Sequence, residues 1–212
     1  IEELEFGAYI DDGYIVIRDE SGIVHQICSK DELKIIGNHN LENALAAAAI
    51  SFFSGIDTAV IADALKKFPG VEHRIEYCGI VDGVKFYNDS KGTNVDASII
   101  ALKALERDIV LIAGGDGKAQ DFTELGENLL GRVKALVLLG RDAKDIEKAA
   151  RAAGFSNIYH ENDMNDCVKR AHKLSESGDK VLLSPACASW DMYDNYEQRG
   201  DHFKNCVNQL LR

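Results

Sequence analysis

The sequence contains no paired cysteine motif, although it has five cysteines. They are odd in number and lie far apart, at Cys28, Cys78, Cys167, Cys187 and Cys206. Such spacing suggests neither a disulfide framework nor a structural zinc site. Unpaired thiols fit a reducing compartment, so we expect a cytoplasmic protein.

Long apolar segments and an excess of positive charge are also absent. No apolar run approaches the roughly 20 residues of a membrane-spanning helix, and no signal peptide is visible. The net charge of −11 argues against general affinity for nucleic acid or for an anionic membrane surface. Any phosphate group must therefore be bound locally.

Two nucleotide-binding signatures are missing as well. A GxxxxGKS/T loop occurs nowhere, and no GxGxxG follows the first strand of the predicted parallel sheet. The sequence of this chain alone therefore favours neither a P-loop ATPase nor a dinucleotide enzyme. The chain begins at Ile1, without a methionine and within a strand-like pattern, so we expect it to be part of a longer protein.

The first 70 residues predict a small α+β unit. Residues 1 to about 36 alternate in the β manner, which predicts an antiparallel meander. A helix follows over Leu41–Phe53, and Asp57 or Thr58 is placed to cap a second helix. The Pro69-Gly70 pair marks the expected boundary of this unit.

Beyond Gly70, strand-like and helical segments alternate. The strand-like segments are 83–87, 109–113, 135–139, 158–159 and 181–183, and helical segments follow at 95–105, 122–130, 144–153, 164–174 and 196–211. This alternation predicts an α/β fold in which a mostly parallel sheet is covered by helices on both faces.

Polar residues cluster where the predicted parallel strands end, which is where such sheets bind ligands. The first cluster, Asn88–Asn94, lies between a short strand and a helix that Thr93 or Asn94 can cap. Its helix-start amides and the Lys91 ammonium could bind an anionic ligand, and the Asp89 carboxylate lies in the same cluster. A capped turn with solvated charges explains the same residues equally well.

Two further clusters follow later strands. The glycines of Gly114–Lys118 let backbone N–H groups approach a ligand while Lys118 supplies a positive charge, although a tight turn with an exposed lysine has the same pattern. Ser184 and Ser189 could bind a carboxylate, with aromatic residues after them to wall a small pocket. Cys187 between them is expected to be a small buried residue, because no histidine is spaced to activate it.

Two shorter motifs lie nearer the N-terminus. Asn40 and Asn43, three residues apart on one helix face, could hydrogen-bond the edge of a heterocycle. Simple capping of that helix by Asn38 or Asn40 is the alternative. Arg74, at the expected boundary, could bind phosphate or form an interdomain salt bridge.

Together these motifs resemble the Mur ligases of peptidoglycan synthesis, and within that family the ligases that add glutamate. The motifs occur in the family's order, as His39-Asn40-x-x-Asn43, His73-Arg74, Asn88–Asn94, Gly115–Lys118 and Ser184–Gly200. The resemblance implies that residues 1–73 are the end of a central ATP-binding domain and that residues 74–212 are the C-terminal, Rossmann-like domain. The P-loop, the magnesium ligands and the UDP site would then lie upstream of Ile1, so this fragment alone is expected to be inactive.

The resemblance also implies a reaction and a set of ligands. The expected reaction is an ATP-dependent and Mg²⁺-dependent amide ligation, in which the carboxylate of UDP-N-acetylmuramoyl-L-alanine becomes an acyl phosphate that the amine of D-glutamate attacks. Lys91 is expected to be catalytic and to contact ATP together with Asn40, Asn43, Arg74 and Asp89, whereas Thr93, Lys118, Ser189 and Tyr196 are expected to bind D-glutamate. The protein is expected to be a monomer.

A non-catalytic function stays open at this point. The same strand-end motifs could hold an acidic metabolite in an α/β module that signals to a partner protein. Nothing within the 212 residues distinguishes this module from a ligase.

Overall fold

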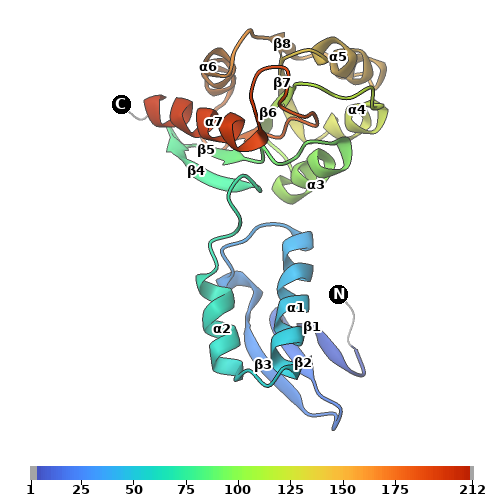
Figure 1. The fold of residues 1–212 in the computed structure, drawn as a ribbon, viewed down its shortest axis with the longest axis vertical. Helices are drawn as coiled ribbons and strands as arrows, with labels where there is room; N and C mark the ends of the chain where they lie inside the picture. The colour runs from blue at the N-terminus through green and yellow to red at the C-terminus, as the bar shows by residue number, and fades with distance from the viewer. Residues whose placement is uncertain (1–3, 211–212) are drawn as a thin grey trace. The chain divides into compact units, whose positions relative to one another are not determined.

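The computed structural model describes residues 4–210 and separates into two compact units, which divide between Gly70 and Val71 (Figure 1). Among the described residues, no helix is both long enough and apolar enough to cross a bilayer.

In the first unit, a three-stranded antiparallel sheet packs against two helices. The strands are β1 (Gly7–Asp11), β2 (Tyr14–Arg18) and β3 (Val24–Ser29), in that spatial order. A short 3-10 helix, η1 (Lys30–Glu32), precedes α1 (Asn38–Phe53) and α2 (Thr58–Lys67). Their shared core includes Ile15, Ile17, Ala44, Leu45, Ala48 and Ile61. The predicted meander and both predicted helices are therefore confirmed.

The two helices of this unit begin differently. Asp57 caps α2, because its side chain accepts a hydrogen bond from a backbone N–H in the first turn (2.8 Å). The N-cap of α1 is Gly37, with a φ of 93°, and no side chain caps this helix. The expectation that Asn38 or Asn40 caps α1 is wrong. Asn38 is already helical, and the amide of Asn40 donates to the carbonyl of Ile36 (2.8 Å).

The second unit contains a six-stranded sheet with the spatial order β4-β5-β9-β6-β7-β8. Its strands are β4 (Glu76–Val81), β5 (Val84–Asn88), β6 (Ile109–Gly114), β7 (Val133–Leu139), β8 (Ile158–His160) and β9 (Lys180–Leu183). Its helices are α3 (Val95–Leu105), α4 (Thr123–Leu129), α5 (Ala143–Ala152), α6 (Met164–Leu174) and α7 (Tyr196–Leu210). Every neighbouring pair is parallel except β4 and β5, which confirms the mostly parallel sheet.

The central strands are buried on both faces, as expected for a sheet with helices on both sides. Along β6, Val110 and Ile112 share a core cluster with Phe203 of α7 and Val168 of α6. Leu111 points to the opposite face and is also fully buried. The near-continuous apolar runs of the sequence correspond to these doubly covered strands.

Strand β4, which the sequence pattern does not predict, is an antiparallel edge strand. It joins β5 through Asp82 and Gly83, whose φ values are 50° and 82°. Asp-Gly is a favoured two-residue hairpin turn, so a local signal for this hairpin is present in the sequence. Tyr77 and Ile80 on β4 are about half exposed, consistent with an edge position.

One carboxylate is buried where β5 ends. Asp89 is only 6% exposed; its Oδ2 accepts a hydrogen bond from the Ser184 hydroxyl (2.7 Å) and its Oδ1 one from the N–H of Ile75 (3.3 Å). Burial disfavours the charged form and raises the pKa of Asp89 to about 7. The hydrogen bonds and the charges of Arg74 and Arg199 act in the opposite direction but are outweighed.

Gly114, at the end of β6, provides a first test of the fold. Its φ is 123°, and an added Cβ would overlap the carbonyl oxygen of Leu139 on β7. We expect Gly114→Ala to lower the free energy of unfolding by more than ~2 kcal/mol, because backbone overlap adds to the strain of a positive φ. The control is Gly131→Ala: Gly131 has a φ of 76° but open space around an added Cβ, so only about 1 kcal/mol should be lost. Equal losses in urea unfolding would contradict the strand-end geometry.

The buried Asp89 carboxylate predicts a pH dependence of stability. Between the ordinary aspartate pKa of about 3.9 and a pKa of about 7, the folded protein retains a proton that the unfolded chain has released. The free energy of unfolding should therefore fall as pH rises through this window, by about 4 kcal/mol from this group. Asp89→Asn cannot titrate and should show a weaker dependence in urea unfolding at about pH 5 and about pH 8. An identical dependence in both proteins would count against the raised pKa.

Candidate functional site

Four loops meet at one edge of the sheet in the second unit, because they follow the adjacent parallel strands β5, β9, β6 and β7. These loops contain the polar clusters 88–94, 184–191, 114–118 and 140–142. Since β9 lies between β5 and β6, its loop lies between theirs. Backbone hydrogen bonds run in both directions between Asp116 and Ala188 (2.9 and 2.8 Å) and join the loops after β6 and β9.

Gln120 connects three parts of this edge. Its Oε1 accepts a hydrogen bond from the N–H of Val95 at the start of α3 (3.3 Å), and its Nε2 donates to the carbonyl of Ala186 (2.5 Å). The Gln120 side chain, in the loop after β6, is thus hydrogen-bonded both to the start of α3, which follows the loop after β5, and to the loop after β9. Sequence reasoning missed Gln120, because a glutamine in a polar loop carries no signal of its distant partners.

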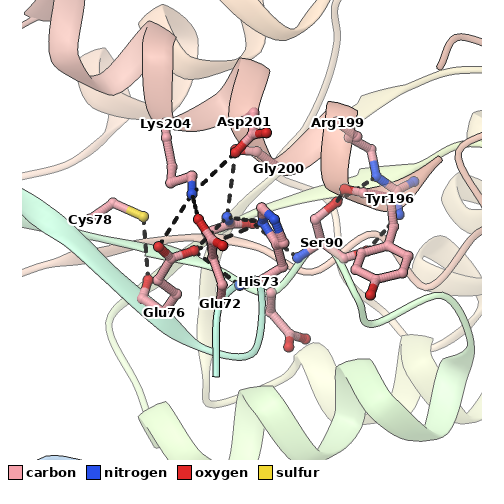
Figure 2. Close-up of polar contacts among 12 residues, drawn as sticks. Glu72, His73, Glu76, Cys78, Ser90, Tyr196, Arg199, Gly200, Asp201 and Lys204 are labelled. Atoms are coloured by element: carbon pink, nitrogen blue, oxygen red, sulfur yellow. Dashed lines mark hydrogen bonds and ion pairs between the residues drawn. The ribbon is translucent and has the colours of Figure 1, made fainter. Parts of the chain in front are cut away.

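Arg199 on α7 is a buried cation between two of the loops. It is 2% exposed, and its guanidinium donates to the hydroxyl and carbonyl of Ser90 (3.0 and 2.8 Å) (Figure 2). It also donates to the carbonyl of Cys187 (3.0 Å). The Ser90 hydroxyl in turn donates to the carbonyl of Tyr196 (2.8 Å). Burial lowers the pKa of Arg199 to about 10, so the group is still charged at neutral pH. All three acceptors of this charge are formally neutral.

Acidic residues around the loop after β7 already have partners. The Arg141 guanidinium pairs with Asp116 (3.0 Å), and the N–H of Arg141 donates to Asp191 (2.8 Å). The Asp142 carboxylate accepts from the N–H of Gly117 (2.5 Å). Among the residues that the structure describes, none of these three carboxylates forms an ion pair with Lys91 or Lys118.

The two lysines that the sequence singles out lie against aromatic rings. The Nζ of Lys91 is 5.4 Å from the ring centre of Tyr196, and the Nζ of Lys118 is 4.0 Å from that of Trp190. Such positions allow cation–π attraction. Within residues 4–210 neither ammonium group is paired with a carboxylate. Both lysines can therefore receive an anionic group.

The remaining residues expected to bind D-glutamate lie on the connected loops. Asn94, not Thr93, caps α3, because its side chain accepts from the N–H of Ala97 (2.9 Å). The half-buried Thr93 is thus not needed for capping. Ser189 is buried after β9, and Tyr196 is the first residue of α7. Lys91 and Tyr196 are in contact. Thr93, Lys118 and Ser189 lie on three different loops, which are connected by the hydrogen bonds of Gln120 and by the backbone pair of Asp116 and Ala188.

The residues expected to bind ATP are divided between the two units. Asn40 and the exposed Asn43 lie on α1 of the first unit. Arg74, Asp89 and Lys91 lie in the second unit, with Arg74 exposed and Asp89 buried.

Cys187 is inert, as expected. Its side chain is fully buried, and burial raises the pKa of the thiol to about 12. His73 and His202, which would have to activate the thiol, have other partners: Nδ1 of His73 lies 2.9 Å from the Asn88 amide, and Nδ1 of His202 lies 3.0 Å from the Tyr193 hydroxyl. A cysteine-hydrolase mechanism is therefore not supported.

One cluster in the described part of the chain has the composition of a metal site. Glu72, His73 and Asp201 could offer three ligand atoms. The ammonium group of Lys204 pairs with both Glu72 and Asp201, however, so a cation already lies among these ligands. This cluster does not fit Mg²⁺.

Sequence comparisons identify relatives of this chain. The family model described as "Mur ligase, glutamate ligase domain" matches residues 73–187. A UDP-N-acetylmuramoylalanine–D-glutamate ligase of Thermoanaerobacter sp. (strain X514) is 51% identical over 211 residues, which are 99% of this chain and 46% of the relative. The ligase of the same name from Clostridioides difficile (strain 630) is 48% identical and covers 96% of this chain and 45% of its own length. The chain thus spans slightly less than half the length of these relatives.

Solved structures share the fold at lower sequence identity. The UDP-N-acetylmuramate-alanine ligase MurC of Thermotoga maritima matches with a TM-score of 0.66 and 19% identity, over 93% of this chain and 44% of that one. A Mycobacterium tuberculosis folylpolyglutamate synthase complexed with ADP matches with a TM-score of 0.62 and 17% identity, over 92% of this chain and 46% of that one. With a family model covering more than half of its residues, the chain belongs to the Mur ligase family.

Proposed function

We propose that this chain is the C-terminal part of an ATP-dependent ligase that joins D-glutamate to UDP-N-acetylmuramoyl-L-alanine. The observation that carries the proposal is that Lys91 and Lys118, on connected loops of an acidic protein, form no ion pair with a carboxylate within the described part of the chain. The names of the relatives support the same substrates. In this proposal residues 1–73 end the central ATP-binding domain and residues 74–212 form the C-terminal domain.

Lys91 is assigned to the phosphate group in transfer. As ATP phosphorylates the alanyl carboxylate, negative charge develops on the phosphoryl oxygens, and a fixed ammonium group stabilises that charge. Asp89 and Arg74 are assigned to the nucleotide, and so are Asn40 and Asn43 in the first unit. ATP supplies the phosphoryl group that activates the carboxylate as an acyl phosphate.

Lys118, Thr93 and Ser189 are assigned to the two carboxylates of D-glutamate, with Tyr196 against its side chain. A diacid needs several donors, and these residues offer one ammonium group and two hydroxyls on three connected loops. Holding the amine close to the acyl carbon lowers the activation free energy of the attack, and for good alignment this effect can reach ~7–11 kcal/mol. Attack by the amine gives a tetrahedral intermediate, from which phosphate leaves and the amide forms.

A competing function, a non-catalytic module that binds an acidic metabolite, makes a different prediction for the complete protein. The ligase should turn ATP over to ADP continuously only when D-glutamate and UDP-N-acetylmuramoyl-L-alanine are both present, because the amine of D-glutamate must consume the acyl phosphate before the next ATP can react. Coupled measurement of ADP, with L-glutamate as the control for stereochemistry, tests this. ADP release that ignores the amino acid, or none at all, would contradict the proposal.

The assignment of Lys118 predicts a selective kinetic effect. In the complete ligase, Lys118→Met should raise KM for D-glutamate by roughly 10–100-fold, since one charge-assisted hydrogen bond is lost. KM for ATP should change by less than about twofold. Lys103→Met, which removes an exposed ammonium from the last turn of α3, is the matched control and should alter neither value. Equal increases for both substrates would count against the assignment.

A further inference from the structure

The second unit begins with a turn in a strained backbone conformation. His73 and Ile75 have φ values of 61° and 45°. These values are uncommon for residues other than glycine, and a β-branched residue such as Ile75 is a strong outlier there. Strained residues of this kind persist only where the surrounding structure holds them in place.

Glu76 supplies contacts that close this turn. Its Oε2 accepts hydrogen bonds from the backbone N–H of His73 (3.0 Å) and from the side-chain amide of Asn88 (3.0 Å). The same amide lies 2.9 Å from Nδ1 of His73, which can accept its second hydrogen. A single carboxylate oxygen therefore holds both the turn and the end of β5.

Lys204 on α7 lies beside the other oxygen of this carboxylate. Its Nζ is 3.4 Å from Oε1 of Glu76 and 3.1 Å from Asp201, and it also contacts Glu72 (Figure 2). One ammonium group thus lies among three carboxylates and attracts each of them. The turn is tied in this way to the helix that also carries Arg199.

The turn and Asn88 together hold the loop after β5. The carbonyl of His73 accepts a hydrogen bond from the N–H of Lys91 (3.1 Å), and Oδ1 of Asn88 accepts one from the N–H of Ser90 (3.1 Å). Two chains of hydrogen bonds therefore lead from the Glu76 carboxylate to this loop, one through His73 and one through Asn88.

We propose that Glu76, supported by Lys204, is a positioning residue that fixes the backbone of Lys91 at the phosphate-binding end of the site. The inference depends on the proposed function only for the role of Lys91, because the hydrogen bonds exist whatever the loop binds. Without an acceptor at position 76, the N–H groups of His73 and Asn88 lose a partner and the strained turn is released. The loop around Lys91 then opens more often.

Amide hydrogen exchange in the 212-residue chain, measured residue by residue by NMR, tests this positioning. Glu76→Met removes both acceptor oxygens at similar size, and exchange at Lys91 and Ser90 should accelerate about tenfold. Glu76→Gln keeps one oxygen for the two N–H groups and should retain most of the protection. Lys134→Met is the matched control: it removes the ammonium that pairs with Asp179 (2.7 Å) near the opposite strand ends, and should leave these two amides unchanged.

Two outcomes of the exchange experiment overturn the inference. One is unchanged exchange at Lys91 in Glu76→Met, and the other is an equal acceleration at every core amide, which reports general destabilisation. In the complete ligase the same variant should lower kcat about tenfold and leave KM for D-glutamate within about twofold. Faster exchange at Lys91 with an unaltered kcat would refute the proposed role of Lys91, while the positioning contact would stand.

Discussion

The position of β9 between β5 and β6 is the constraint on which the site depends. Because these strands are parallel, their carboxyl ends lie at one edge of the sheet. Strand β9 is the last of them in the sequence, and it places the segment after Leu183 between the loops after β5 and β6, which come almost a hundred and about seventy residues earlier in the chain. Hydrogen bonds from Gln120 and Arg199, and the backbone pair of Asp116 and Ala188, then fix the loops relative to one another. Without this strand order, residues from distant parts of the chain would not form one site.

The distribution of charge at this edge suits an acidic protein to the anionic ligands proposed for it. The carboxylate of Asp116 is bound to an arginine and to the backbone N–H of Lys118, and that of Asp142 to a backbone N–H, and within residues 4–210 neither forms an ion pair with the Lys118 ammonium group. Arg199 adds a buried positive charge whose acceptors are neutral. Local positive charge is thus retained against a net charge of −11, which is the arrangement that a phosphate and a diacid require.

Much of the fold could be predicted from the sequence, since period-two and period-3.6 patterns gave the strands and helices of both units within a few residues. The hairpin of β4 and β5 was missed although Asp82-Gly83 is a turn signal, and the strand order is not a local property of the sequence. For the site, the resemblance to the family identified the candidate residues that bind ATP and D-glutamate. The roles of Glu76, Gln120 and Arg199 depend instead on partners 12 to 109 residues away, which no local pattern shows.

The central claim is that the second unit contains an acceptor site for D-glutamate. Titrating the 212-residue chain with D-glutamate and then with L-glutamate, while following backbone amide NMR shifts, tests it most directly because Thr93, Lys118 and Ser189 are all present in this chain. We expect saturable shifts at these three residues and their neighbours with the D isomer only. Equal shifts with both isomers, or no shift at these residues with D-glutamate in large excess, would contradict it.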